Sequence, residues 1–167
     1  MQALEPPDSH SVSAAIGWLE LGNWREAAAE LEAVAPALCQ HPAVLWVRYD
    51  IHAAAGHWDL ASEVAFTLAR SMPDEPGAWT KLAYATRRKP GGGIPPAKEI
   101  LAAARRRFPG EVLIAYNLAC YECQLGNLPE ARVWLQEAFQ LGNPALLKQM
   151  SLSDPDLAPL RLEIGQM

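Results

Sequence analysis

The sequence has almost no segments typical of β-strands and no long hydrophobic run. No stretch reaches the roughly 18 unbroken apolar residues that a membrane-spanning helix needs. The opening residues 1–8 lack the basic start and apolar run of a signal peptide, so we expect a cytoplasmic protein. Three cysteines, an odd number without a regular framework, argue against a disulfide-stabilised secreted scaffold.

A strong charge of one sign is also missing. The chain has 14 Lys and Arg against 19 Asp and Glu, a net charge of -5, which disfavours nucleic-acid binding by the protein as a whole. Apolar residues, in contrast, make up 50% of the 167 residues, so disorder is excluded and a hydrophobic core is expected. They recur at steps of three and four residues, as in Ala28, Leu31, Val34 and Leu38, which predicts helices.

A short segment returns along the chain at regular spacing. Residues 22–27, 56–61 and 126–131 each begin with glycine and end with alanine. The first two glycines are 34 positions apart and the next two are 70 apart, which is twice 34 plus two. This spacing predicts a degenerate copy between them that lacks the glycine turn and carries a two-residue insertion in a flexible loop, residues 90–96.

Each recurring residue type in this segment has a structural role. A glycine can adopt the left-handed conformation that ends the first helix of a pair. Small residues on the second helix then let the two helices approach closely, and we expect this of Ala27, Ala61, Ala97 and Ala131. In the tail, residues 153–157 read as a capped helix start with proline near its beginning.

The pattern resembles the tetratricopeptide repeat, whose period is 34 residues. The best single match is Ala115-Tyr116-Asn117-Leu118-Ala119-Cys120, followed by Gly126 and Ala131. The resemblance implies an all-α fold, a right-handed α-solenoid of four helix pairs with C-terminal capping helices. It divides the chain into an N-terminal extension (1–8), four repeats (9–42, 43–75, 76–111 and 112–143) and a cap (144–167).

In this family the first helix of each pair lines a concave groove. The resemblance therefore places eight residues in a partner-binding groove: Trp46, Asp50, Lys81, Tyr84, Arg88, Tyr116, Asn117 and Cys120. It also projects Val12, Ser13, Ile16, Val47 and Thr80 onto the same face. Such a groove implies a scaffold or adaptor that binds a protein or peptide, with Trp46, Tyr84 and Tyr116 as anchors and Lys81 and Arg88 selecting an acidic feature. The alternative for some of these groove residues is that they pack against neighbouring helices or against the chain's own tail.

Two other functions remain open. Between Arg87 and Arg107 lie seven bases and one acid, a local net charge of +6, which suits a phosphate, a nucleic acid or an acidic protein surface. The competing interpretation is a solvated surface, since Arg105, Arg106 and Arg107 lie near a helix C-terminus where bases favour the dipole. A second copy of the chain could also fill the groove, so monomer and homodimer are both possible.

Residues with the spacing of a metal site or a catalytic site are few. Cys120 and Cys123 form a C-x-x-C, but they fall inside a predicted helix rather than at its start, and no second pair accompanies them. We therefore expect buried small residues there, and no metal. The four histidines are scattered and no catalytic arrangement is found. We expect no enzymatic activity and no cofactor.

Overall fold

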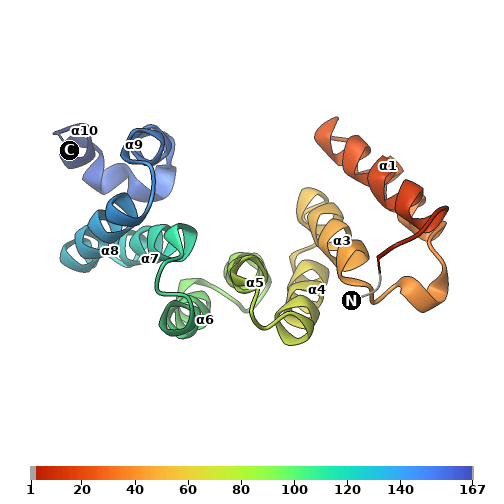
Figure 1. Ribbon diagram of the computed structural model, residues 1–167. Coiled ribbons are helices and arrows are strands. Elements are labelled where there is room, and N and C mark those ends of the chain that lie inside the picture. Colours follow the sequence, from red (N-terminus) through yellow and green to blue (C-terminus); the bar gives the residue numbers. More distant parts are fainter. Residues whose placement is uncertain (1–2, 167) are drawn as a thin grey trace. The chain divides into compact units, whose positions relative to one another are not determined.

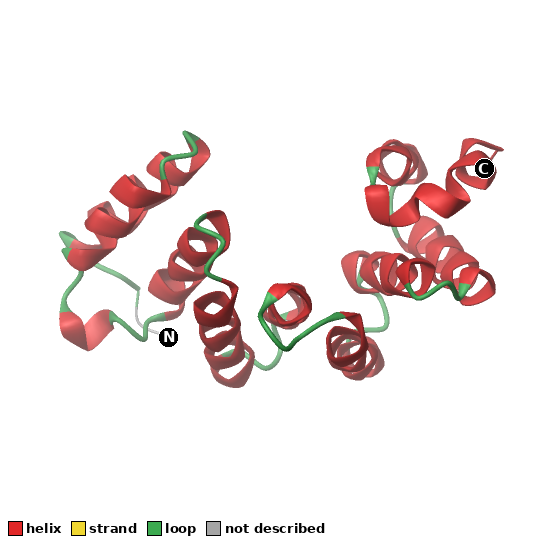
Figure 2. Ribbon diagram, turned by 180° about the vertical axis from the view of Figure 1, so that it is seen from behind, coloured by secondary structure: helices red, strands yellow, loops and turns green. Residues whose placement is uncertain are grey.

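The structure, a computed structural model, describes residues 3–166, and its elements are all helical within that range (Figure 2). The chain forms two compact units: unit 1 ends at Gly93 and unit 2 begins at Ile94. The first two residues of the predicted extension 1–8 and the last residue of the predicted cap 144–167 lie outside the described residues.

Within its described residues 3–93, unit 1 contains five α-helices and one short 3-10 turn. They are α1 (Asp8–Glu20), α2 (Trp24–Glu32), η1 (Pro36–Leu38), α3 (Pro42–Ala54), α4 (Trp58–Ser71) and α5 (Pro76–Arg88). Figure 1 labels α1, α3, α4 and α5 among them. Helix α1 packs on α2, α3 packs on α4, and α4 packs on α5. The Asn23 side chain caps α2 by accepting a hydrogen bond from the backbone N–H of Glu26 at 3.3 Å.

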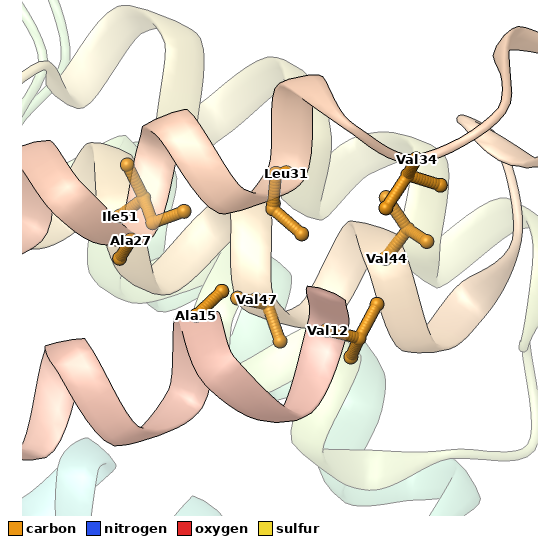
Figure 3. Close-up of a cluster of buried hydrophobic side chains, with 8 residues drawn as sticks. All are labelled: Val12, Ala15, Ala27, Leu31, Val34, Val44, Val47 and Ile51. Atoms are coloured by element: carbon orange, nitrogen blue, oxygen red, sulfur yellow. The ribbon is translucent and has the colours of Figure 1, made fainter. Parts of the chain in front are cut away.

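The core at the start of unit 1 is built from small and branched aliphatic side chains (Figure 3). Its buried members come from α1, α2, the turn after α2 and α3: Val12, Ala15, Ala27, Leu31, Val34, Val44, Val47 and Ile51. Val12 and Val47 are thus core residues, which corrects their placement in the groove. An error of one residue in the repeat register moves a position by about 100° around the helix. The helical period alone therefore does not separate a groove residue from its buried neighbour.

Unit 2 contains α6 (Ile94–Arg107), α7 (Val112–Gln124), α8 (Leu128–Leu141), α9 (Pro144–Ser153), η2 (Pro155–Leu160) and α10 (Arg161–Gln166). Helix α7 packs against α6 on one side and α8 on another, and η2 lies on α7 as well. The predicted capped start after α9 is confirmed: Asp154 Oδ1 accepts a hydrogen bond from the N–H of Asp156 at 2.9 Å, with Pro155 at the first helical position. The side chains of Leu157, Leu160 and Ile164 are buried.

Glycine directly follows the C-cap residue of the first helix in three repeats. Gly22, Gly56 and Gly126 have φ values of 74°, 72° and 81°, the left-handed region that other residues rarely adopt. In the third repeat α5 ends at Arg88 with Lys89 extended, Pro90 stands at the glycine position, and Gly91 follows with a φ of 71°. The two-residue insertion falls in this turn, as predicted: α6 begins 18 positions after α5, whereas the second helix of each other repeat begins 16 positions after the first.

The predicted flexible loop 90–96 is instead a tight turn followed by a helix. The N–H of Gly92 donates to the carbonyl of Lys89 at 3.0 Å, and that of Gly93 donates to the carbonyl of Thr86 at 3.1 Å. A Cβ on Gly92 would lie 1.9 Å from the Thr86 carbonyl oxygen, so no larger residue fits the turn. Helix α6 then begins at Ile94, with two prolines in its first turn, where a missing N–H costs no hydrogen bond. The boundary between the units thus falls inside the predicted repeat 76–111.

Candidate functional site

Three predicted groove residues gather around one lysine together with Tyr49, which was not predicted. We call this group the lysine cluster: Trp46, Tyr49 and Asp50 on α3, and Lys81 on α5. Lys81 forms an ion pair with Asp50, and its Nζ lies 4.2 Å from the ring centre of Tyr49 and 5.5 Å from that of Trp46. The hydroxyl of Tyr49 donates to the carbonyl of Lys81 at 3.2 Å. The ammonium is therefore held by an acid and two aromatic faces of its own chain.

The two helices are positioned for this contact by local features. Proline stands at the first turn of each, and the residue before it caps the helix: His41 Nδ1 accepts from Ala43 N–H at 3.2 Å, and Glu75 Oε1 accepts from Gly77 N–H at 3.3 Å. A Cβ on Gly77 would lie 3.3 Å from the Trp46 ring, tighter than ordinary contact. Glycine at this position thus lets the indole lie over the start of α5.

The second group is the arginine stack, formed by Trp58 on α4 and by Tyr84 and Arg88 on α5. The guanidinium carbon of Arg88 lies 3.4 Å from the ring centre of Tyr84 and 5.3 Å from that of Trp58. The two rings meet edge to face, with centres 5.8 Å apart. Lys81, Tyr84 and Arg88 recur at helical spacing, so the lysine cluster and the arginine stack share one face of α5.

In unit 2 the predicted groove residues are covered by the chain's own tail. Tyr116 is 4% exposed and its hydroxyl donates to Asp154 Oδ2 at 2.9 Å, while Cys120 is 2% exposed with its sulfur 3.6 Å from the same oxygen. One turn further along α7, Gln124 Nε2 donates to the carbonyl of Asp156 at 3.0 Å. Burial, the neighbouring Cys120 and the hydrogen bond to Asp154 all raise the pKa of Tyr116.

This arrangement corrects two of the predicted groove positions. Tyr116 and Cys120 cannot present a free surface while η2 lies on them, and the alternative of packing against the tail is the one that the structure has. Asn117 stays partly exposed, but its side chain bonds to its own helix, since Nδ2 donates to the carbonyl of Leu113 at 2.7 Å. Of the eight predicted residues, the structure brings together the five that lie in unit 1.

The basic stretch 87–107 is divided between the units, with 87–89 in unit 1 and 98–107 in unit 2. In unit 2 two of its bases are neutralised by buried or half-buried acids: Lys98 Nζ lies 2.9 Å from Glu122 Oε1, and Arg105 pairs with Glu137. Arg105 also donates to the carbonyl of Phe108 at 3.0 Å, at the end of its helix. These partners lower the positive charge that the stretch offers to a phosphate.

Potential metal ligands meet at one place in the part of the chain that the structure describes. Cys120, Asp154 and Asp156 offer ligand atoms within 4.8 Å of one another. The Asp154 carboxylate already accepts bonds from Tyr116, Cys120 and the N–H of Asp156, so helix capping and tail docking account for it. The C-x-x-C residues are both buried in α7, as predicted, and burial raises the pKa of Cys123.

Three contributors to these surfaces were missed by sequence reasoning. Tyr49 is the neighbour of the predicted Asp50, and its ring faces the Lys81 ammonium. Trp58 follows the turn after α3, and its ring faces Arg88. Asp154 reads as a helix cap, and nothing in the repeat register connects it with Tyr116, 38 positions earlier. Among residues 3–166, no helix is both long and apolar enough to span a membrane.

Comparison with known proteins supports the fold. No protein-family model and no curated protein matches the sequence. Solved structures do resemble it, among them two that match most of its length. The thermophilic TPR protein TTC0263 of Thermus thermophilus is 20% identical, with a TM-score of 0.74 over 95% of this chain and 84% of its own. The MamA RS-1 ArsTM double mutant is 14% identical, with a TM-score of 0.68 over 90% of this chain and 80% of its own. At these identities the likeness shows the fold, and the predicted all-α fold of tetratricopeptide-repeat type is confirmed.

Proposed function

We propose that the protein is a non-catalytic scaffold that binds a partner protein through the face of unit 1 formed by α3 and α5. The proposed surface consists of Trp46, Asp50, Lys81, Tyr84 and Arg88. The observation that carries the proposal is a contrast between the units. On α7 the chain covers the corresponding face with its own tail, whereas Tyr84 on α5 is 40% exposed and is flanked by Arg88.

The composition of this face suits protein recognition. Trp, Tyr and Arg carry much of the binding energy at protein interfaces. Trp and Tyr bury large areas with few rotatable bonds to order. Here the aromatic rings hold the cations before any partner arrives, so less conformational entropy is lost on binding. Lys81 is paired with Asp50, which leaves Arg88 as the group that selects an acidic feature of the partner.

The experiment compares three forms of the protein as bait in its source lysate, at low and at high salt. The test variant carries Lys81→Ala and Tyr84→Ala. The control carries Phe66→Ala and Arg70→Ala, a second aromatic–guanidinium pair in unit 1, with Cζ 5.7 Å from the ring centre. We expect a discrete protein that wild type and control retain at high salt and the test variant loses, with helicity unchanged in all three.

Two results would contradict the proposal. If the test variant still captures the partner, the partner does not bind this face. If the test variant and the control variant both fail to capture it, binding depends on the folded state of unit 1 in general and not on Lys81 and Tyr84. Captured nucleic acid that salt removes would instead favour the basic stretch, because phosphate contacts weaken steeply with ionic strength. Light scattering at two protein concentrations tests the remaining alternative, self-association.

A further inference from the structure

A pocket of about 510 Å³ opens beside the arginine stack in unit 1. Its walls come from the first turn of α4 and from the end of α5 with the turn that follows. Trp58 and Leu60 provide apolar wall, Arg88 and Asp59 provide charge, and the lining is completed by Gly56, His57 and Pro90. The pocket lies where α4 begins, so it is distinct from the lysine cluster on α3 and α5.

Arg88 reaches this pocket with its orientation fixed and its charge unpaired. Its guanidinium lies on the Tyr84 ring, and its hydrogen bond to the Tyr84 carbonyl is long, at 3.4 Å. Within residues 3–166 no carboxylate forms an ion pair with it, and Asp59 shares the pocket without pairing to it. Stacking uses the face of a guanidinium and leaves its N–H groups at the edge for a ligand.

The repeat register shows that packing does not require an arginine here. Helices α1, α3, α5 and α7 all have 13 residues, so their first residues align. In this alignment Arg88, the last residue of α5, corresponds to Glu20, Ala54 and Gln124, which are all exposed and not basic. The guanidinium at this place is thus particular to the third repeat.

From this geometry we infer that the pocket binds a carboxylate next to an apolar side chain, presented by an acidic segment of a partner protein. The carboxylate pairs with the edge of Arg88, in the two-pronged geometry that guanidinium groups favour. The apolar neighbour lies against Trp58 and Leu60. Asp59 on the pocket wall repels a second negative charge, which selects a single carboxylate over a phosphate group. The inference rests on the proposed function only in that the acidic segment belongs to a partner.

The test follows the indole N–H resonance of Trp58 in ¹H–¹⁵N spectra of the full chain while small probes are added. The first probe is acetyl-Leu-Glu-amide, the second is acetyl-Leu-Gln-amide, which has the same shape without the charge, and the third is inorganic phosphate. We expect a saturable shift with the Glu probe and an affinity about tenfold lower for the Gln probe, since a charge-assisted hydrogen bond contributes that much or more. Phosphate should bind more weakly than the Glu probe.

Variants make the result specific to the pocket. Arg88→Gln should weaken the Glu probe about tenfold and leave the Gln probe unchanged. Arg88→Lys, which keeps the charge without the planar fork, should restore part of the loss. The matched control is Arg25→Gln, because Arg25 also stacks on a tryptophan, with Cζ 4.4 Å from the Trp24 ring centre, but lies outside the pocket. It should change nothing.

The inference is overturned if the Glu probe gives no saturable shift, if it binds no better than the Gln probe, if Arg88→Gln leaves its affinity unchanged, or if phosphate binds more tightly. These results do not depend on the partner-capture experiment. Capture that fails while the Glu probe binds would contradict the proposed function alone. Capture that succeeds while the Glu probe fails would contradict the pocket alone.

Discussion

At the scale of single residues, glycines with positive φ lie in the turns after the first helices. Gly22, Gly56 and Gly126 directly follow the C-cap residue, with φ values from 72° to 81°, and sequence reasoning found these three turns by their shared neighbours. In the third repeat Pro90 stands at that position, and Gly91 lies one residue later in the inserted turn. The left-handed conformation after the C-cap is thus a backbone requirement that glycine meets in three repeats.

Helix α1 and the turn after it offer a matched pair of glycines for testing this requirement. Gly22→Ala should lower the free energy of unfolding by about 1–2 kcal/mol, the cost of a left-handed conformation for an L-residue. Gly17→Ala should raise it by about 0.5–1 kcal/mol, because Gly17 lies inside α1 and a Cβ there meets no atom within 4 Å. Urea unfolding of the two variants measures both effects. Shifts of the same sign would show that backbone conformation does not control this turn.

The small residues of the second helices were also within reach of the sequence. Ala27, Ala61, Ala97 and Ala131 were expected to lie where helices approach closely, and all four are fully buried. The groove positions were less predictable. Val12 and Val47 lie in the core, because the pattern specifies a helical face only to within about one residue. The ion pair between Lys81 and Asp50 joins two helices and has no periodic signal in the sequence.

At the scale of elements, the tail defines the surface of unit 2. The segment η2 lies along α7 with three anchoring contacts, from Tyr116 and Cys120 to Asp154 and from Gln124 to Asp156. The sequence indicated a cap but not which side chains it would cover, since the contacts join a repeat to a segment outside the repeat register. Long-range pairs of this kind leave no periodic signal.

The Tyr116–Asp154 contact has a pH signature. At neutral pH, Tyr116→Phe should lower the free energy of unfolding by about 1–3 kcal/mol, because a donor to a carboxylate is lost. The folded-state pKa of Tyr116 is raised above its ordinary 10.0, so above that pH the unfolded chain releases a proton that the folded chain keeps. The stability of wild type therefore falls with rising pH in this range, and the phenylalanine variant escapes that part of the fall.

Urea unfolding at pH 7 and at pH 10.5 measures the gap between wild type and Tyr116→Phe, which should narrow at the higher pH. Tyr84→Phe serves as the control, because the Tyr84 ring is exposed and removal of its hydroxyl breaks no buried hydrogen bond. A gap that stays constant or widens with pH would show that the phenol of Tyr116 is not held in its neutral form.

At the scale of the whole molecule, the division after Gly93 is the feature that the sequence did not indicate. Four repeats in register suggest one continuous array, and the extra residues between them suggest a loop. The structure has a tight glycine turn there and a boundary between two compact units. Repeat periodicity reports on local packing and carries no information about which neighbouring pairs form a cooperative unit.

The boundary predicts that residues 1–93 and 94–167 fold separately. Each has its own buried core and is of a size that can fold alone. Expressed as two fragments, both should keep their helical circular dichroism and unfold cooperatively in urea. If either fragment is unfolded under conditions where the whole chain is folded, the units depend on each other and the boundary is not one of stability.

The same division places the natural fluorophores unequally. Of the six tryptophans, Trp18, Trp24, Trp46, Trp58 and Trp79 lie in unit 1, and only Trp134 lies in unit 2. Emission from the whole chain is therefore mostly a report on unit 1, while helical circular dichroism weighs both units. In a single melt, a difference between the two signals therefore distinguishes the unfolding of unit 1 from that of unit 2 without any label. Trp134→Phe would remove the tryptophan emission of unit 2, so that tryptophan emission comes only from unit 1 or from a bound partner.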